Sequence, residues 1–285
     1  MWNRVQNLPW ALRWAIKWLL FGATLFLISF PDPRLFVRHV QHWQDPNALI
    51  DPDLAALQPW VAEVKRQLKP EMEPRKALKT VERFVYKKVP YRFDWETWGS
   101  ADYLPTLAEV LDKGKEDCDG QAVVAASILQ NLGYRAELVT DFAHVWVKTD
   151  KGETMQPGKR KSVIAGKTGL EVHWETLTKT LPRALGYSVA PFPLIRELIV
   201  LGVLWLVLLR PGVGRRVGII CAAVMLEGLM FLRVGGVDWK DPVVWAQWWG
   251  LLHLVGGVFV LFVLGWRATR AGRRASAIAA APADK

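Results

Sequence analysis

Hydrophobic positions are concentrated near the two ends of this chain, whereas the middle alternates between apolar and polar positions. Four apolar runs, at residues 14–30, 193–209, 217–232 and 243–266, have close to the length needed to cross a membrane as helices. The polar stretch between the first two runs is long enough to bury a core of its own. The pattern predicts four transmembrane α-helices and one extramembrane domain.

The expected organisation follows from these runs. It comprises an N-terminal transmembrane anchor, a proline-rich neck, an extramembrane domain, a three-helix transmembrane bundle and a disordered basic, alanine-rich tail, at residues 1–30, 31–50, 51–187, 188–268 and 269–285. A cleaved signal peptide is the alternative for the first run, but no small-x-small cleavage site follows it. A buried soluble helix hairpin is the alternative for the short second and third runs.

Composition and charge agree with membrane insertion. The 285 residues are 51% hydrophobic and include 16 tryptophans, and the formal net charge is +10. Much of the positive charge flanks the apolar runs, which favours membrane topology over nucleic-acid binding. Short basic loops predict cytoplasmic N- and C-termini, residues 31–190 in the periplasm, and a multi-pass protein of the bacterial inner membrane.

The middle of the chain combines helical and strand patterns. Helical spacing of apolar residues covers residues 53–68 and 74–88, and an Ala-, Val- and Leu-rich helix is expected at residues 121–132, ended by Gly133. Three β-prone runs follow, at residues 135–140, 144–149 and 153–156, the last two joined by a hairpin at Asp150-Lys151-Gly152. The domain is therefore expected to be α+β.

Cys118 and His144 are the candidate catalytic pair. The only other cysteine, Cys221, lies within an apolar run, where its backbone cannot meet that of Cys118, so Cys118 is expected to be a free thiol. At a helix N-terminus the unpaired N–H groups and the helix dipole lower a thiol pKa. His144, on a strand, could take and return the proton, and hairpin pairing makes Gln156 the best-placed side chain to orient the imidazole.

Each of these residues also has an ordinary structural interpretation. A lone cysteine is often a small buried side chain, and a lone histidine on a strand is often a satisfied surface residue. Asp141 and Asp150 are nearby carboxylates, but their loop and turn positions make them poorer orienting groups than Gln156. The joint pattern, with Cys118 opening a helix and His144 starting a hairpin strand, favours chemistry.

Residues 105–158 resemble the core of the transglutaminase-like superfamily, which shares the papain-like fold of cysteine hydrolases and acyltransferases. The resemblance rests on Glu116-Asp117-Cys118-Asp119-Gly120 before an Ala-rich helix, on Leu132-Gly133-Tyr134 and on His144-Val145-Trp146-Val147. It implies a Cys-bearing helix packed on an antiparallel sheet, with Cys118 as nucleophile and His144 as base. The family's usual Asp-Pro pair is replaced here by Gln156-Pro157. An amide accepts a hydrogen bond but does not offset an imidazolium charge.

The resemblance implies a membrane-anchored cysteine hydrolase or peptidase that acts on amide bonds at the periplasmic membrane surface. Its partners would be a protein or peptide substrate, the lipid bilayer and other membrane-protein subunits, with no nucleic acid. No metal or cofactor is expected, because no ligand spacing or phosphate-binding loop is present. The alternative is a catalytically inactive transglutaminase-like scaffold, or an accessory subunit of a larger membrane complex.

Polar residues within the apolar runs need partners. Glu227 and His253 are costly in hydrocarbon, and a contact between them is one hypothesis, with packing against arginine, interfacial water or a partner protein as alternatives. Four glycines predict close helix contacts: Gly228, Gly250, Gly256 and Gly257.

Overall fold

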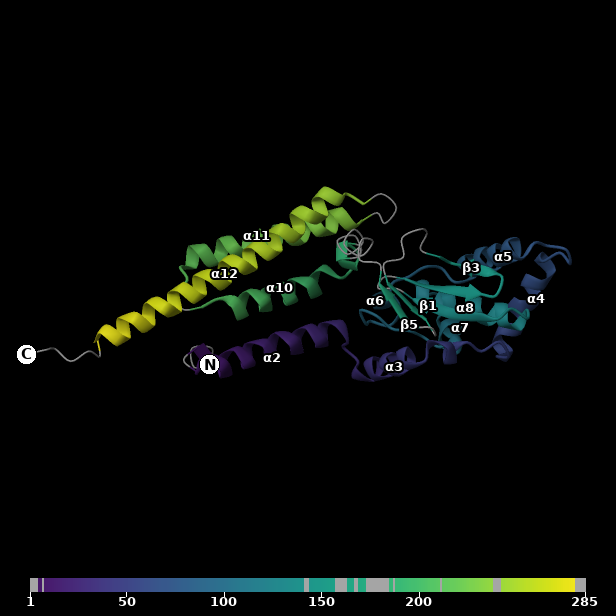
Figure 1. Ribbon diagram of the computed structural model, residues 1–285, viewed down its shortest axis with the longest axis horizontal. Helices are drawn as coiled ribbons and strands as arrows, with labels where there is room; N and C mark the ends of the chain where they lie inside the picture. Colours follow the sequence, from purple (N-terminus) through teal and green to yellow (C-terminus); the bar gives the residue numbers. More distant parts are fainter. Residues whose placement is uncertain are drawn as a thin grey trace, which may run out of the picture. The chain divides into compact units, whose positions relative to one another are not determined.

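The computed structural model describes residues 5–6, 8–140, 144–156, 163–166, 169–172, 185–186, 188–210, 212–237 and 242–279. The chain forms two compact units (Figure 1). The membrane unit combines Met1–Ile28 with Leu181–Lys285, and the extramembrane unit is Ser29–Thr180. Asp141, Pro157, the tail beyond residue 279 and part of the loop at residues 234–241 lie outside the described residues.

The extramembrane unit is an α+β domain that contains most of its helices before its strands. Its helical elements are α3 (Pro33–Gln44), η1 (Pro46–Leu49), η2 (Ala55–Leu57), α4 (Gln58–Gln67), α5 (Pro74–Lys88), α6 (Asp94–Thr97), α7 (Leu107–Lys113) and α8 (Cys118–Asn131). Its strands are β1 (Ala136–Thr140), β2 (Val145–Thr149), β3 (Gly152–Thr154), β4 (Val163–Gly166) and β5 (Gly169–Val172). The predicted neck is thus largely helical.

The strands form one antiparallel sheet in the order β3-β2-β1-β4-β5. Strands β1, β2 and β3 make the meander that the sequence predicted, and β2 turns into β3 through a tight hairpin with Thr149 paired to Gly152. Gly152 has φ of 132°, a conformation that L side chains rarely adopt. The strands β4 and β5 were not predicted from the sequence.

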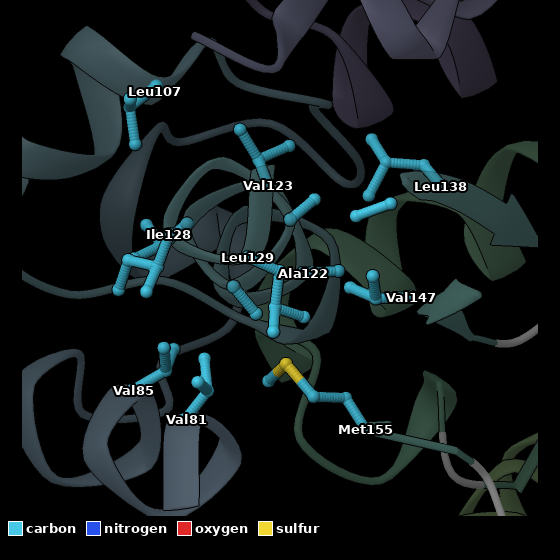
Figure 2. Packing of buried hydrophobic residues seen from close by; sticks show 14 of the residues in the cluster. Val81, Val85, Leu107, Ala122, Val123, Ile128, Leu129, Leu138, Val147 and Met155 are labelled. Carbon is cyan, nitrogen blue, oxygen red and sulfur yellow. The ribbon is translucent and has the colours of Figure 1, made fainter. Parts of the chain in front are cut away.

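Helix α8 is the centre of the extramembrane core. Every residue from 119 to 129 is buried, as expected for a helix that is apolar on all sides. Figure 2 shows its side chains Ala122, Val123, Ile128 and Leu129 surrounded by residues of α5, α7, β1 and β2. The core therefore holds both ends of α8, including the end that carries Cys118, against the sheet and the helices.

The membrane unit contains α2 (Trp10–Ser29), α10 (Leu194–Leu208), α11 (Arg215–Gly236) and α12 (Val244–Ala279). In the described part of the chain, three of these helices, α2, α11 and α12, are long and apolar enough to cross a membrane. The sequence predicted four, and α10 is the correction. Its 15 residues rise about 22 Å, less than the roughly 30 Å of a hydrocarbon core, because Pro193 precedes it and Pro211 follows closely in the sequence.

Consecutive helices of the membrane unit alternate in direction. At one end, the Nζ of Lys17 in α2 donates to the carbonyl of Val207 in α10 at 2.7 Å, and the ring of Trp14 lies 6.1 Å from that of Phe262 in α12. At the other end, Gln247 of α12 donates to the carbonyl of Gly235 in α11 at 3.0 Å. The start of α2 and the later part of α12 therefore lie at the same end of the bundle.

Helices α11 and α12 cross closely and run side by side (Figure 1). A Cβ on Gly228 would lie 2.8 Å from the carbonyl oxygen of Gly250, and one on Gly257 would lie 2.6 Å from Met225. The prediction for Gly256 was wrong, because a Cβ there meets nothing within 4 Å. The predicted contact between Glu227 and His253 is present, with Oε2 and Nε2 3.8 Å apart.

Helix α12 continues as far as Ala279. The segment that the sequence predicted as the start of a disordered tail is thus helical over residues 269–279. Alanine and arginine are strong helix formers, which accounts for this extension.

Candidate functional site

Cys118 is the first residue of α8, and Asp117 caps the helix. The Asp117 carboxylate accepts a hydrogen bond from the backbone N–H of Asp119 at 3.2 Å, and its carbonyl accepts from Gln121 N–H at 3.1 Å. The side-chain amide of Gln121, through Nε2, donates to the carbonyl of Val89 at 2.8 Å. These bonds fix the turn on which the cysteine sits.

Gly120 leaves room for the side chain of Glu116, which lies two residues before the start of α8 and packs against the first turn of the helix. A Cβ at this position would lie 2.3 Å from Cγ of Glu116, closer than real contacts allow. The Asp-Cys-Asp-Gly sequence thus has a steric requirement for glycine after the acidic residue, because the Glu116 side chain occupies the space where a larger residue would project.

The thiol of Cys118 contacts the beginning of β2. The backbone N–H of Val145, the residue after His144, donates a hydrogen bond to the Cys118 sulfur. Cys118 remains partly exposed to solvent, whereas Val145 is buried. The fold therefore brings the start of α8 and the start of β2 together.

The imidazole of His144 has a defined backbone partner. Its Nε2 lies 2.7 Å from the carbonyl oxygen of Met155. A carbonyl only accepts hydrogen bonds, so Nε2 carries the proton in this contact, and in a neutral imidazole Nδ1 is then the nitrogen able to accept one.

The backbone of Met155 is held by α5. Met155 N–H donates to a carboxylate oxygen of Glu82 at 3.0 Å, and the Thr154 hydroxyl donates to the same oxygen at 2.8 Å. Met155 has φ of 61°, and its side chain is buried in the core (Figure 2). Glu82 therefore fixes the carbonyl that meets His144.

Gln156 has a different partner from the one expected. Its amide donates to the carboxylate of Glu153 at 2.6 Å, at an exposed position. The left-handed conformation of Met155 ends β3 at Thr154, two residues before the predicted end of the strand, and presents the Met155 carbonyl to His144. The orienting contact predicted for the Gln156 side chain is replaced, in this geometry, by a backbone carbonyl.

Four carboxyl groups gather beside the thiol. Single oxygens of Asp94, Glu116, Asp117 and Asp119 lie within 4.8 Å of one another, and this is the one group of potential metal-ligating side chains found among the described residues. Asp94 accepts from the backbone N–H of Tyr103 at 2.7 Å, while its other oxygen has no described hydrogen-bond partner.

Burial changes the protonation of the carboxyl groups in this cluster. Burial, and then the charge of Asp117, raises the pKa of Glu116 to about 8. The same causes raise the pKa of Asp94 and of Asp119 well above the usual carboxyl range. Glu116 also accepts hydrogen bonds from Trp98 Nε1 and from Asp117 N–H. At neutral pH Glu116 is therefore largely protonated.

The electrostatic environment of Cys118 differs from the sequence expectation. Burial, and then the charge of Asp117, raises the pKa of the Cys118 thiol well above its ordinary value; the Val145 N–H opposes this with a smaller effect. The resting group is a thiol rather than a thiolate. The sequence predicted a lowered pKa for this thiol, whereas burial and then the charge of Asp117 shift the pKa in the opposite direction.

Comparison with protein families gives one match. Residues 62–155 match the model described as the transglutaminase-like superfamily. This part of the chain is a transglutaminase-like core domain. A comparison with curated proteins found no match. The family match covers Cys118, His144 and Met155, and it ends one residue before Gln156.

Several residues of the transglutaminase-like domain that shape this site were missed by the sequence analysis. Asp94 and Glu82 lie far from Cys118 in the sequence, and only folding brings them near it. Tyr86, one helical turn after Glu82, is a further case: burial, followed by the charges of Glu82 and Cys118, raises the pKa of its phenol to about 12. The run of acids around Cys118 was a visible signal for the unusual charge at the site.

Proposed function

We propose that this chain is a membrane-anchored cysteine hydrolase that cleaves amide bonds of a protein or peptide at the periplasmic surface of a bacterial inner membrane. The observation that supports the proposal is the hydrogen bond from Val145 N–H to the Cys118 thiol, because Val145 is the residue that directly follows His144 in the chain. The transglutaminase-like core at residues 62–155 supports thiol acyl chemistry, and the three apolar helices support anchoring.

In the proposed reaction His144 acts as a general base. As the sulfur of Cys118 bonds to the substrate carbonyl carbon, Nδ1 of His144 takes the thiol proton, and the carbonyl electrons move to oxygen. The C–N bond then breaks, and the leaving amine receives that proton. Water attacks the thioester with His144 again as base, the C–S bond breaks, and the thiol regains its proton. Because the resting thiol is protonated, attack and proton transfer are coupled.

The backbone N–H of Cys118 is the proposed donor to the oxyanion. Among the first N–H groups of α8, those of Asp119 and Gly120 are bound to the carboxylates of Asp117 and Asp119. The N–H of Gln121 is bound to the Asp117 carbonyl. This leaves the N–H of the nucleophile itself available. We propose hydrolysis rather than transamidation, because no second acceptor site is identified.

The side of the membrane follows from charge and helix direction. The start of α2 and the later part of α12 lie at the same end of the bundle, and basic residues are concentrated there. By the preference of basic segments for the cytoplasm, we propose that both termini are cytoplasmic and that the transglutaminase-like domain is periplasmic.

Acylation of the purified full chain by p-nitrophenyl acetate tests the activity. We expect an acetyl adduct on Cys118, detected by peptide mass spectrometry, which then hydrolyses. Cys118→Ala should abolish the adduct, and His144→Ala should slow its formation by about 100-fold or more. Cys221→Ala serves as the matched cysteine control. Acylation at another residue, or at an unchanged rate without His144, would contradict the proposal.

A non-catalytic scaffold is the second candidate. The observation that favours it is the burial of the Cys118 thiol beside the charge of Asp117, which together raise the pKa of the thiol. This role predicts that the wild-type chain forms no acetyl adduct at any pH from 6 to 9, and that Cys118→Ala leaves function in cells unchanged. The acylation experiment therefore separates the two candidates.

A further inference from the structure

Helix α5 exposes a row of positive charges on its solvent-facing side. Arg75, Lys79 and Arg83 follow one another at intervals of four residues, so they lie on neighbouring turns of one helix face. All three residues are exposed, whereas the residues of α5 that are buried in the core are apolar. We call these three residues the basic ridge.

The acidic groups near the basic ridge are engaged elsewhere. Glu73 pairs with Lys76 at 3.7 Å, and Glu63 pairs with Lys88 at 2.8 Å. Glu82 binds the last residue of β3 and the residue after it. No ion pair or hydrogen bond joins a side chain of the ridge to any residue that the structure describes. The ridge therefore presents its charge to solvent.

This arrangement of charge opposes the local rules of helix stability. Like charges four residues apart destabilise a helix, and the basic ridge is built from such pairs. Basic residues are also unfavourable near the positive end of the helix dipole, and the first turn of α5 contains Arg75 and Lys76 but no acidic residue. Local helix stability therefore does not explain the ridge, and an anionic partner would offset its charge.

Helix α5 connects the basic ridge to the candidate site. The helix packs along β3 (Figure 1). Glu82, the residue before the last cation of the ridge, accepts a hydrogen bond from Met155 N–H at 3.0 Å, and the Met155 carbonyl meets His144. One turn further along α5, Tyr86 is 46% exposed and is affected by the charge of Cys118. A ligand on the ridge would therefore lie beside the end of α5 that approaches the thiol.

The spacing of the basic ridge fits an extended peptide. Successive cations are roughly 6 Å apart along the helix axis, because each residue of a helix rises about 1.5 Å. In an extended peptide, alternate side chains point the same way and repeat about every 6.8 Å. Acidic side chains at alternate positions of such a peptide would each meet one cation of the ridge.

We propose that the basic ridge binds an extended acidic segment of the protein or peptide substrate, which brings the amide bond to be cleaved to Cys118. This inference rests on the proposed hydrolase function and adds the class of substrate. The attraction is between exposed charges, so salt weakens it.

Fluorescence anisotropy with the full chain in phosphatidylcholine nanodiscs tests the basic ridge. The probe is a fluorescein-labelled peptide of three Glu–Ser repeats, and the neutral reference peptide has three Gln–Ser repeats. A Cys118→Ala background separates binding from chemistry. We expect the acidic peptide to bind about tenfold more tightly than the neutral one at low salt, and the difference to shrink at roughly 0.5 M NaCl.

Neutralisation of the basic ridge should remove this preference. The triple variant is Arg75→Gln, Lys79→Gln and Arg83→Gln. Glutamine is a good helix former, and the loss of like-charge pairs should leave the thermal unfolding temperature at least as high as in the wild type. Weaker binding by this variant then reports the lost charges and not a lost fold.

A matched control removes the same amount of charge outside α5. It replaces three exposed basic residues of α3, of the segment before β1 and of β2: Arg34→Gln, Arg135→Gln and Lys148→Gln. This control should keep the preference of about tenfold for the acidic peptide. An equal loss of binding in the triple variant and in the control would overturn the proposal, since net charge alone would then explain it.

Acylation connects the basic ridge to the thiol. With Cys118 intact, the p-nitrophenyl ester of the acidic peptide should acylate Cys118 about tenfold faster than the ester of the neutral peptide at the same low concentration. The triple variant should remove the difference. Equal acylation rates despite unequal affinities would show that the bound segment does not lead to Cys118, and would overturn the proposal.

The remaining outcomes are also distinguishable. Equal affinity of the Cys118→Ala chain for the two peptides would overturn the proposal. Displacement of the acidic peptide by phosphatidylglycerol vesicles, at the same concentration of accessible negative charge, would assign the basic ridge to a membrane surface and overturn it as well. If the acidic peptide binds through the ridge but no acyl adduct forms with either ester, the hydrolase function fails and the ridge remains a binding site for acidic peptides.

Discussion

The Nε2 atom of His144 lies 2.7 Å from the carbonyl oxygen of Met155, and the backbone N–H of the same methionine is bound to Glu82 of α5 at 3.0 Å. The carboxylate of Glu82 thus fixes the backbone of Met155, and the carbonyl of Met155 binds the imidazole of His144. The sequence predicted that a side chain, that of Gln156, would have that role. Here the geometry assigns it to a main-chain atom.

Loss of Glu82 should therefore impair the orientation of His144. We expect Glu82→Ala to reduce the rate of acetylation of Cys118 by roughly tenfold to 100-fold, because small misplacements of a catalytic group have effects of this size. Stopped-flow measurement with p-nitrophenyl acetate gives the rate. Glu63→Ala removes a surface carboxylate that pairs with Lys88 and is the control. Gln156→Ala is measured in parallel. If it reduces the acetylation rate as much as Glu82→Ala does, the residue that orients His144 is Gln156.

The Cys118 thiol should react slowly at neutral pH. In a Cys221→Ala background we expect iodoacetamide to label Cys118 more slowly than free glutathione at pH 7, with the rate rising above the pH at which ordinary thiols ionise. Asp117→Asn should speed labelling at pH 7, since asparagine also caps helices but carries no charge. Asp112→Asn, at an exposed position in α7, is the control. Fast labelling at pH 6 in the wild type would contradict this description of the site.

The stability of the extramembrane unit should fall as the pH rises through the range in which the Glu116 carboxyl group is protonated in the folded domain but ionised in the unfolded chain. Its pKa is about 8 when folded and 4.5 otherwise, so between these values the folded protein holds a proton that the unfolded chain has released. The free energy of unfolding then decreases with rising pH, by up to about 1.4 kcal/mol per pH unit, and levels off above pH 8. Thermal unfolding followed by near-UV circular dichroism from pH 5 to 8 would measure it.

Glu116→Gln tests the source of that slope. Trp98 Nε1 donates to one carboxyl oxygen of Glu116 and Asp117 N–H donates to the other; the amide of glutamine keeps one of these two acceptors and does not titrate. We expect a shallower pH dependence in this variant, whereas Glu96→Gln, on the exposed surface nearby, should retain the wild-type slope. An equal slope in both variants would assign the effect to other carboxyl groups of the cluster.

The crossing of α11 and α12 should depend on Gly228. A methyl group there would lie 2.8 Å from a backbone oxygen of Gly250, so Gly228→Ala should destabilise the bundle by about 1–3 kcal/mol. Gly256→Ala on α12 is the matched control, because its Cβ meets nothing within 4 Å. Unfolding of the full chain in mixed micelles compares the two, and equal stability of both variants would contradict the close crossing.

The sequence predicted the parts of this fold that depend on local periodicity. The helices at residues 74–88 and around residue 125, the hairpin at Gly152 and the apolar runs all have patterns within a few residues. The short length of α10 was harder to predict from the sequence. The hydropathy of this run is high throughout, but the prolines on either side limit the helix to 15 residues. Strands β4 and β5 are only four residues each, too short for a clear alternation.

The candidate site was predictable in its residues more than in its electrostatics. Cys118 and His144 had helix and strand contexts that could be recognised. The raised pKa of the thiol results first from its burial and then from the charge of Asp117, and the imidazole partner results from one left-handed residue, Met155. Both depend on tertiary contacts, which local sequence patterns do not specify.

Met155 links the packing of the domain to the alignment of its histidine. The sulfur-bearing side chain is 2% exposed within the apolar cluster around α8, while the carbonyl of the same residue meets the imidazole. Loosening of the interior, by heat or by oxidation of this methionine, would therefore displace the base as well. Loss of reactivity and melting of the domain should consequently occur over the same temperature interval, with no folded but misaligned form in between.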